Sequence, residues 1–96
     1  MPEYKISAKA LDDLKSIGRY TSRKWGKPQR NKYLGMIDDS FQAISIQPEL
    51  GMACNYIKPG YRKYHAGRHL IFYRQKRDHI EIIRIFHDSM DIIRHL

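Results

Sequence analysis

Five histidines are the side chains of this chain that could do acid–base or metal chemistry near neutral pH. His87, Asp91 and His95 are four residues apart, so they would share one face if residues 90–96 were helical. A metal site needs three or four converging ligands, and this segment is too short to hold a rigid one. The sequence therefore predicts no metal site and no cofactor. The histidines are His65, His69, His79, His87 and His95.

Lysine and arginine side chains recur along the expected sheet, with tyrosines between them. A small ribonuclease could use such parts, because it needs a base for the 2′-hydroxyl, an acid for the leaving 5′-oxygen and cations around the phosphorane. His69 or His87 could be the base or the acid, and Arg84 the cation. The alternative, favoured by composition, is a solvated basic face with tyrosines packed at the sheet. The side chains are Arg62, Lys63, Arg68, Arg74, Lys76, Arg77 and Arg84, with Tyr61, Tyr64 and Tyr73.

Other polar and aromatic candidates have structural interpretations. Glu81 is the only acid inside the last three expected strands, so it is interpreted as an ion-pair partner rather than a general base. Cys54 has no activating neighbour in the sequence and is interpreted as an inert small residue. Trp25, with Tyr20 and Tyr33 near it, could serve a partner interface, but closing the core of a helical hairpin is the favoured interpretation.

Length and charge limit the classes of protein to consider. A chain of 96 residues predicts one domain over residues 1–96, and 42% hydrophobic residues are too many for a disordered chain. The 18 Lys and Arg against 10 Asp and Glu favour an acidic partner: nucleic acid, an anionic membrane or an acidic protein. The single cysteine, with no secretory signal or membrane-spanning stretch in the sequence, predicts a cytoplasmic protein.

The elements that must position these residues follow from the hydrophobic periodicity. Residues 3–7 alternate as a short strand, and Ser7 can cap a helix that Gly26 ends. A second helix over residues 28–46 follows so closely that the two must form an antiparallel hairpin. Residues 48–60 are expected to form a loop, and residues 61–65, 69–75 and 80–87 to form strands. Residues 19–32 contain six Lys and Arg and no acid, so the hairpin tip is strongly basic.

The expected order β-α-α-β-β-β predicts an α+β fold in which the helical hairpin covers one face of an antiparallel sheet. The last three strands form a meander, and the isoleucine-rich last strand is expected to be buried on both faces. The apolar face of the first helix is predicted at Leu11, Leu14, Ile17, Thr21 and Trp25. The predicted core includes Leu14, Ile37, Phe41, Ile71, Ile83 and Ile85.

Short stretches along nearly the whole chain follow one another in a recognisable order. They are Arg23-Lys24-Trp25-Gly26, Tyr33-Leu34, Pro48-Glu49-Leu50-Gly51, Gly60-Tyr61-Arg62-Lys63, Gly67-Arg68-His69-Leu70-Ile71-Phe72-Tyr73-Arg74, Arg84-Ile85-Phe86-His87, and Met90-Asp91 with Arg94-His95-Leu96. None is diagnostic alone. Together, at this length and charge, they resemble the RelE/ParE toxin superfamily, and within it the ParE toxins of type II toxin–antitoxin modules.

The resemblance implies a function as well as a fold. The chain would be a non-enzymatic toxin that poisons DNA gyrase, leaves DNA breaks and blocks replication. A small ParD-like antitoxin, with a ribbon-helix-helix region and a tail that wraps the toxin, would neutralise it in an even-numbered complex. The alternative is a ribosome-dependent messenger RNA endonuclease of the RelE branch. That branch often has Arg where His69 and Ser89 stand here, and only His95 falls near a catalytic position of it, which favours the gyrase branch.

Two surfaces are expected to carry the interactions. The last strand and the segment after it combine polar and apolar side chains, as a protein interface would. An amphipathic antitoxin helix could lie on the hairpin groove or the sheet face, and an extended stretch could pair with a sheet edge. Its expected contacts are Trp25, Tyr33 and Tyr73. The residues expected to bind the target are Arg68, His69, Arg84, His87, Met90, Asp91, Arg94 and His95.

Overall fold

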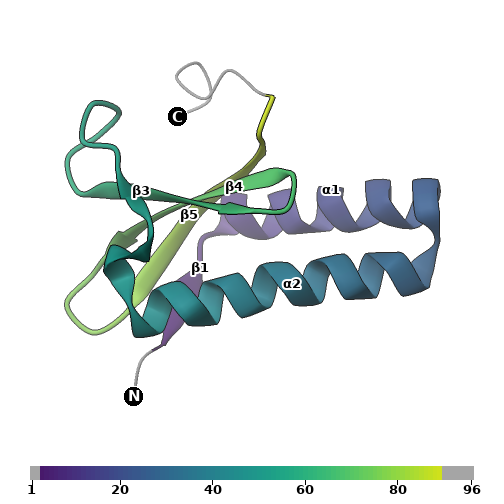
Figure 1. Ribbon diagram of the computed structural model, residues 1–96, viewed down its shortest axis with the longest axis horizontal. Helices are drawn as coiled ribbons and strands as arrows, with labels where there is room; N and C mark the ends of the chain where they lie inside the picture. Colours follow the sequence, from purple (N-terminus) through teal and green to yellow (C-terminus); the bar gives the residue numbers. More distant parts are fainter. Residues whose placement is uncertain (1–2, 90–96) are drawn as a thin grey trace.

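The computed structural model describes residues 3–89 and consists of two long helices packed against a five-stranded sheet. Figure 1 shows the helices side by side, with the turn between them well away from the sheet. The predicted helices and the last three strands are confirmed to within one residue. The elements are β1 (Tyr4–Ile6), α1 (Ala8–Trp25), α2 (Lys27–Ile46), the 3-10 helix η1 (Pro48–Leu50), β2 (Met52–Ala53), β3 (Tyr61–Ala66), β4 (His69–Gln75) and β5 (Ile80–His87).

The sheet is mixed, whereas the sequence predicted an antiparallel one. Its strand order is β1-β5-β4-β3-β2. The meander of β3, β4 and β5 is antiparallel as expected, but β1 pairs parallel to β5, with Tyr4 opposite Ile80 and Ile6 opposite Ile82. The expected loop over residues 48–60 also contains a strand, β2, which pairs with β3. The α+β class and the order of the predicted elements are confirmed, and the purely antiparallel sheet is wrong.

Ser7 fixes the start of α1 to the sheet. Its side-chain oxygen accepts a hydrogen bond from the N–H of Ala10 at 3.0 Å, which makes it the N-cap that the sequence predicted. The same hydroxyl donates to the carbonyl of Ile83 at 2.8 Å, and the backbone N–H of Ser7 donates to the carbonyl of Ile82. The first turn of α1 therefore lies at the edge of β5, directly after the three residues that β1 covers.

Two apolar clusters lie on the two faces of the sheet, as expected for a last strand buried on both sides. The larger one fills the space between the sheet and the helices, and Ile37, Phe41, Ile71 and Ile85 are buried in it as predicted. Leu14 is half-buried at its margin. The smaller cluster, on the opposite face, comprises Cys54, Tyr61, Phe72 and Phe86, with Ile57, Leu70 and Ile83 packed against it.

A bulge in β5 gives Ile83 a different position from the predicted one. The β4–β5 register shifts between Phe72 and Tyr73, where Ile83 is the extra residue on β5. Because one residue is inserted, Ile82 and Ile85 face the helices although they are three residues apart. Ile83 is half-buried against the smaller cluster. The prediction that Ile83 belongs to the main core is therefore wrong, since strict alternation does not reveal a bulge.

The buried face of α1 is narrower than predicted. Ala10, Ile17 and Thr21 are buried, but Leu11 and Trp25 remain 45% and 59% exposed. The end of α1 extends beyond the sheet, so no second layer is there to cover Trp25 (Figure 1). The interpretation of Trp25 as a residue that closes the hairpin core is wrong. Within residues 3–89, neither helix is apolar enough along its length to span a membrane.

Candidate functional site

A groove of about 750 Å³ lies between α1, the first half of α2 and the adjoining ends of β4 and β5. Side chains from four elements line it, and their types are cationic, aromatic and imidazole. The groove is therefore the place where side chains that the sequence analysis singled out come together. Its lining includes Asp13, Tyr20, Lys24, Trp25, Tyr33, Arg68, His69, Arg84 and His87.

Tyr33 connects α2 to the turn between β3 and β4. Its hydroxyl oxygen accepts a hydrogen bond from the backbone N–H of Arg68 at 3.0 Å and lies 2.6 Å from Nδ1 of His69. Gly67 in that turn has a φ of 59°, and a Cβ there would lie 2.9 Å from the Tyr33 hydroxyl. The turn therefore requires glycine both for its conformation and for the space that Tyr33 occupies.

His69 is held neutral at pH 7. Burial, assisted by the neighbouring His87, lowers the pKa of His69 from 6.5 to about 4, although Asp88 and Asp13 act in the opposite direction. The two imidazole rings meet edge to face, with centroids 5.4 Å apart. When Tyr33 donates to Nδ1, the proton of the neutral ring is on Nε2. His69 can then offer one N–H to a ligand in the groove.

The end of β5 is tied to the neighbouring turn by polar contacts. Nδ1 of His87 lies 2.7 Å from the Ser89 hydroxyl and 3.4 Å from a carboxylate oxygen of Asp88. That carboxylate also lies 3.5 Å from Nε2 of His65. The backbone N–H of Asp88 donates to the carbonyl of Arg68 at 2.9 Å. These contacts hold the exposed His87 ring beside His69.

The positive charge of Arg84 is balanced within the protein by a carboxylate. Its Nε and Nη2 atoms donate to the two carboxylate oxygens of Asp13 at 2.9 and 3.0 Å. Asp13 also accepts from the backbone N–H of Ile85 at 2.9 Å. The hydrogen bond with Asp13 raises the pKa of Arg84 above its ordinary value. The guanidinium lies 4.5 Å from the Phe86 ring centroid and joins α1 to β5. Because Asp13 balances its charge, it attracts a further anion only weakly.

Exposed aromatic side chains form the rim of the groove on α1. Tyr20 and Trp25 are 57% and 59% exposed, and their rings meet edge to face at 6.3 Å. The ammonium group of Lys24 lies 4.8 Å from the Trp25 centroid and 5.7 Å from that of Tyr20. Large aromatic side chains left exposed beside a cation are typical of an interaction surface.

The groove brings together half of the residues that the sequence analysis assigned to target binding. Arg68, His69, Arg84 and His87 all line it. The other four, Met90, Asp91, Arg94 and His95, lie outside the described residues.

The three residues assigned to antitoxin binding do not lie in one place. Trp25 and Tyr33 line the same groove as the target-binding residues. Tyr73 is fully buried, and its hydroxyl donates to the carbonyl of Pro48 at 2.6 Å and accepts from the N–H of Gly51 at 2.8 Å. Tyr73 thus holds the loop after α2 in place and offers no surface for a partner. Tyr61 is buried as well, so neither Tyr61 nor Tyr73 is available to an RNA ligand on the sheet.

Sequence reasoning missed Asp13 and Lys24 as groove residues and considered Tyr20 only as a neighbour of Trp25 in a partner interface. The only available signal for Tyr20 and Lys24 was their place beside Trp25 in a basic segment. Nothing in the spacing pointed to Asp13, whose partner Arg84 is 71 residues away.

The interpretations of Glu81 and Cys54 as residues without a chemical role agree with their surroundings. Glu81 accepts from Nε of Arg74 at 2.7 Å, so it is an ion-pair partner as predicted. Cys54 is buried, and burial raises the pKa of its thiol, as expected for an inert residue. Among residues 3–89, no three His, Cys, Asp or Glu side chains are grouped to hold a metal ion.

The fold and the groove define a small basic α+β protein with an aromatic and cationic groove. A chain in the structure titled "Chromosomal ParDE TA system from P. aeruginosa" has the same fold, with a TM-score of 0.78 and 22% sequence identity over 91% of this chain and 96% of that one. The sequence model of the family described as "ParE toxin of type II toxin-antitoxin system, parDE" matches residues 4–92. The chain belongs to this family and is a ParE toxin of a type II toxin–antitoxin module, which confirms the resemblance.

Curated relatives align with this chain along nearly their whole length. Toxin ParE1 of Mycobacterium tuberculosis is 36% identical over 94 residues, which are 97% of this chain and 96% of that protein. Toxin ParE1 of Caulobacter vibrioides is 33% identical over 96 residues, 100% of this chain and 99% of the relative. Toxin ParE of Escherichia coli is 25% identical over 97 residues, 100% of this chain and 94% of the relative.

Proposed function

We propose that this ParE toxin poisons DNA gyrase and thereby blocks replication, and that a ParD-like antitoxin neutralises it. Membership of the ParE family supports the toxin class, and the P. aeruginosa chain of the same fold comes from a ParDE toxin–antitoxin system. The observation that carries the proposal is the shared groove. It contains residues expected to bind the target, such as Arg68 and His69, and residues expected to bind the antitoxin, Trp25 and Tyr33.

A shared groove supplies a simple mechanism of neutralisation. An amphipathic antitoxin segment can place apolar side chains against the exposed Tyr20 and Trp25, and a carboxylate against the exposed Arg68. A segment seated there covers His69 and His87, so gyrase cannot reach them at the same time. Gyrase and the antitoxin would thus compete for one surface of the toxin, with no change of conformation required. We further propose that toxins pair through a dimeric antitoxin, which gives an even-numbered assembly in the cytoplasm.

The electrostatics of the groove favour binding rather than catalysis. A ribonuclease needs a cation to hold the charged phosphorane, and Arg84, which the sequence analysis assigned to this role, is engaged by both carboxylate oxygens of Asp13. A general base works best with a pKa near the operating pH, whereas the pKa of His69 is lowered to about 4. We therefore propose that the toxin acts as an inhibitor and not as an enzyme.

The runner-up is a ribosome-dependent messenger RNA endonuclease of the RelE branch. One observation favours it: the Tyr33 hydroxyl lies 2.6 Å from Nδ1 of His69, and the His87 ring is in edge contact with the same imidazole. A tyrosine and two histidines within reach of each other could share acid and base roles, provided that a ribosome completed the site.

The test combines the purified full-length chain with DNA gyrase and negatively supercoiled plasmid. Gyrase poisoning predicts that linear, cleaved plasmid accumulates and that the cognate antitoxin prevents it. Arg68→Glu, in the groove, should abolish the effect, because it reverses the charge of an exposed contact residue. Arg77→Glu, an equally exposed change in the β4–β5 turn, should not. Unchanged gyrase activity, together with codon-phased cleavage of translated messages by primer extension, would establish the endonuclease instead.

A further inference from the structure

The positive charge of the chain is concentrated at one end of the molecule. Residues 14–37 contain seven Lys and Arg and no Asp or Glu, whereas the other 72 residues contain 11 Lys and Arg against 10 Asp and Glu. This segment comprises most of α1, the turn at Gly26 and the first half of α2. Figure 1 shows the turn of the helical hairpin projecting away from the sheet. Nearly the whole net charge of +8 is therefore presented on a protruding element.

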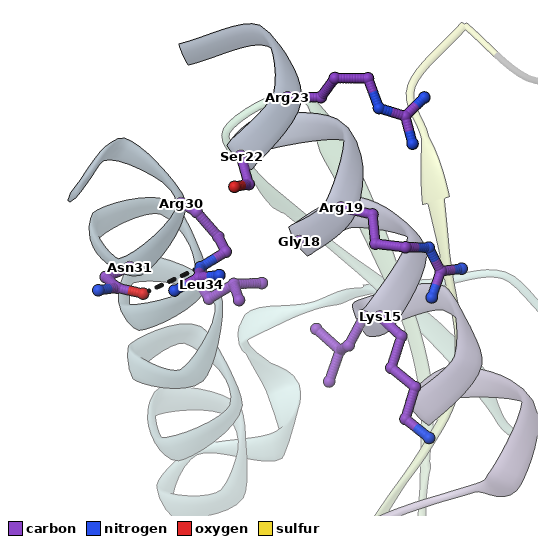
Figure 2. A pocket seen from close by; sticks show the side chains of 9 residues that line it. Lys15, Gly18, Arg19, Ser22, Arg23, Arg30, Asn31 and Leu34 are labelled. Carbon is purple, nitrogen blue, oxygen red and sulfur yellow. Dashed lines mark hydrogen bonds between the residues drawn. The ribbon is translucent and has the colours of Figure 1, made fainter. Parts of the chain in front are cut away.

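A second, shallower groove of about 770 Å³ runs along this element between α1 and α2. Lys15, Arg19 and Arg23 line it from α1 and Arg30 from α2, with Gly18, Ser22 and Leu34 also in the lining. Figure 2 shows the three α1 cations following one another along one side of that helix, with their charged ends extending outward from α1. Their spacing of four residues places successive charges about 6 Å apart. We call Lys15, Arg19 and Arg23 the cationic row.

The cationic row has no counter-ion within the protein. Among residues 3–89, the arginines in ion pairs are Arg74 and Arg84, and no Lys is in one. The only side-chain hydrogen bond from the row within these residues is that of Arg19 Nη2 to the Ser16 hydroxyl at 3.2 Å. Like charges four residues apart destabilise a helix, and only Arg23 is close enough to the C-terminus of α1 to gain from the helix dipole. The row thus costs stability without an internal benefit, which points to an external anion.

The neighbouring side chains indicate what kind of anion. Tyr20 lies three residues before Arg23, on the adjacent row of α1, and both Tyr20 and Trp25 leave more than half of their surface exposed. Aromatic faces beside a line of cations are the parts that bind nucleic acids, because the cations engage phosphates and the rings stack on bases. An acidic peptide could also engage the cations, so competition by polyglutamate is used to distinguish it from a nucleic acid.

We propose that the cationic row of α1 binds the phosphodiester backbone of a nucleic acid strand, with Arg30 on the far side of the groove and Tyr20 available to a base. The cationic row lies on the other side of α1 from the groove that contains His69, and Tyr20, which lines that groove, lies between the two surfaces. The proposal does not depend on which protein the toxin acts upon. It gives the free toxin a direct contact with DNA or RNA wherever its target works.

The test measures binding of the full-length chain, made by cell-free synthesis, to a fluorescein-labelled single strand of about 20 nucleotides by fluorescence anisotropy. The row variant carries Lys15→Gln, Arg19→Gln and Arg23→Gln. The matched control carries Lys58→Gln, Lys76→Gln and Arg77→Gln, which remove the same charge from exposed positions elsewhere. The row variant should bind at least about tenfold more weakly, and its slope of log K against log salt should be smaller by about 2, since each phosphate contact on a single strand contributes about 0.7. The control should change affinity about twofold or less.

Three results would overturn the proposal. Equal losses in the two variants would mean that only net charge matters. Competition by polyglutamate as effective as that of unlabelled oligonucleotide of equal charge would assign the row to an acidic peptide. Displacement of the oligonucleotide by phosphatidylserine vesicles, lost in the row variant, would assign it to a membrane surface. All three residues of the row are exposed, so circular dichroism should show every variant folded, with the row variant at least as stable as the unsubstituted chain. The single change Arg19→Gln repeats the test at about a threefold effect if the triple variant is unfolded.

Discussion

At the scale of single residues, the hydroxyl of Tyr73 connects β4 to the loop that follows α2. It donates to the Pro48 carbonyl, accepts from the Gly51 N–H and is fully buried. A Cβ on Gly51 would lie 2.2 Å from this oxygen, so the loop backbone approaches as closely as only glycine allows. Tyr73→Phe should lower the free energy of unfolding by about 1–3 kcal/mol, because two backbone groups lose their partner.

Chemical denaturation measures this effect, with Tyr61→Phe as the control. Tyr61 is also buried in the sheet, but its hydroxyl makes no side-chain hydrogen bond within residues 3–89. Its substitution should change the free energy of unfolding by about 0.5 kcal/mol or less. If both substitutions were equally mild, the Tyr73 hydroxyl would not be what holds the loop.

His69 predicts a pH dependence of stability. Its pKa is about 4 in the folded chain and about 6.5 when unfolded, so between these values the unfolded chain binds a proton that the folded chain does not. The free energy of unfolding therefore falls as the pH is lowered from 7 to 4, by on the order of 2 kcal/mol after allowance for solvent screening. In His69→Gln, which keeps a hydrogen-bond acceptor for Tyr33, this part of the decline should disappear.

Thermal melts of both proteins at pH 7, 5.5 and 4.5 measure the difference, and a proton NMR titration of the His69 ring checks its cause. Parallel declines in the two proteins would mean that other groups determine the acid sensitivity. A ring that titrates near 6.5 in the folded chain would contradict the burial of His69 directly.

The candidate site could be predicted from the sequence only in part. Arg68 and His69 were found because basic and imidazole side chains recur along the expected strands, which is a local pattern. That Tyr33 contacts His69 depends on how α2 crosses the sheet, since the two residues are 36 positions apart. Likewise, Tyr73 was taken for a surface residue because tyrosine tolerates both environments, and only the packing of the loop decides between them.

At the scale of elements, the bulge in β5 decides which isoleucines hold the core. Ile82 is fully buried among the helices, whereas Ile83 is half-buried on the opposite face. Ile82→Ala should cost about 2–4 kcal/mol of unfolding free energy, and Ile83→Ala about half as much, because the loss scales with the apolar surface removed from the interior. Urea denaturation of the two variants compares the same chemical change at adjacent positions. A larger loss at Ile83 would contradict the bulge.

One ion pair contributes to the attachment of α1 to the sheet, beside the contacts of Ser7 and the apolar core. Asp13 bridges the Arg84 guanidinium and the Ile85 N–H, in a place where β1 no longer covers β5. A double-mutant cycle with Asp13→Ala and Arg84→Ala should give a coupling energy of about 1–3 kcal/mol, because both side chains are largely buried and the contact is bidentate. Arg74 and Glu81, which pair more exposed to solvent, provide the control, with an expected coupling below about 1 kcal/mol. Equal couplings would mean that the Asp13 pair has no special structural role.

The sequence predicted the bounds of the helices and strands better than it predicted which strands pair. Ser7 and Gly26 mark the ends of α1 by local chemistry that any similar chain would share, so its bounds were predictable. The parallel pairing of β1 with β5 joins residues 76 positions apart, as between Tyr4 and Ile80. No local pattern encodes such a contact, because a short alternating strand fits either edge of the sheet in either direction.

At the scale of the whole molecule, α1 separates two surfaces of different chemistry. One side of this helix borders the groove with His69, Tyr33 and the exposed aromatic rim. The other side carries the cationic row. A toxin that is neutralised by an antitoxin and acts on a target on DNA, as proposed, would use both kinds of surface. The arrangement allows an antitoxin to fill the first groove while the second remains open to solvent.

The last prediction tests whether antitoxin and target use one groove. Trp25→Ala removes the largest exposed side chain of the rim, so the cognate antitoxin should bind about tenfold to a hundredfold more weakly, as expected for an aromatic residue at the centre of an interface. Growth arrest on expression should weaken in parallel, because gyrase would contact the same rim. The melting temperature should stay nearly constant, since Trp25 is 59% exposed. Tyr56→Ala, at a 70% exposed aromatic outside the groove, is the control and should alter neither property.

Calorimetry with the purified antitoxin and a plate assay of toxicity measure the two effects. Loss of antitoxin binding with full toxicity would mean that the target binds elsewhere, and neutralisation would then require a mechanism other than direct competition.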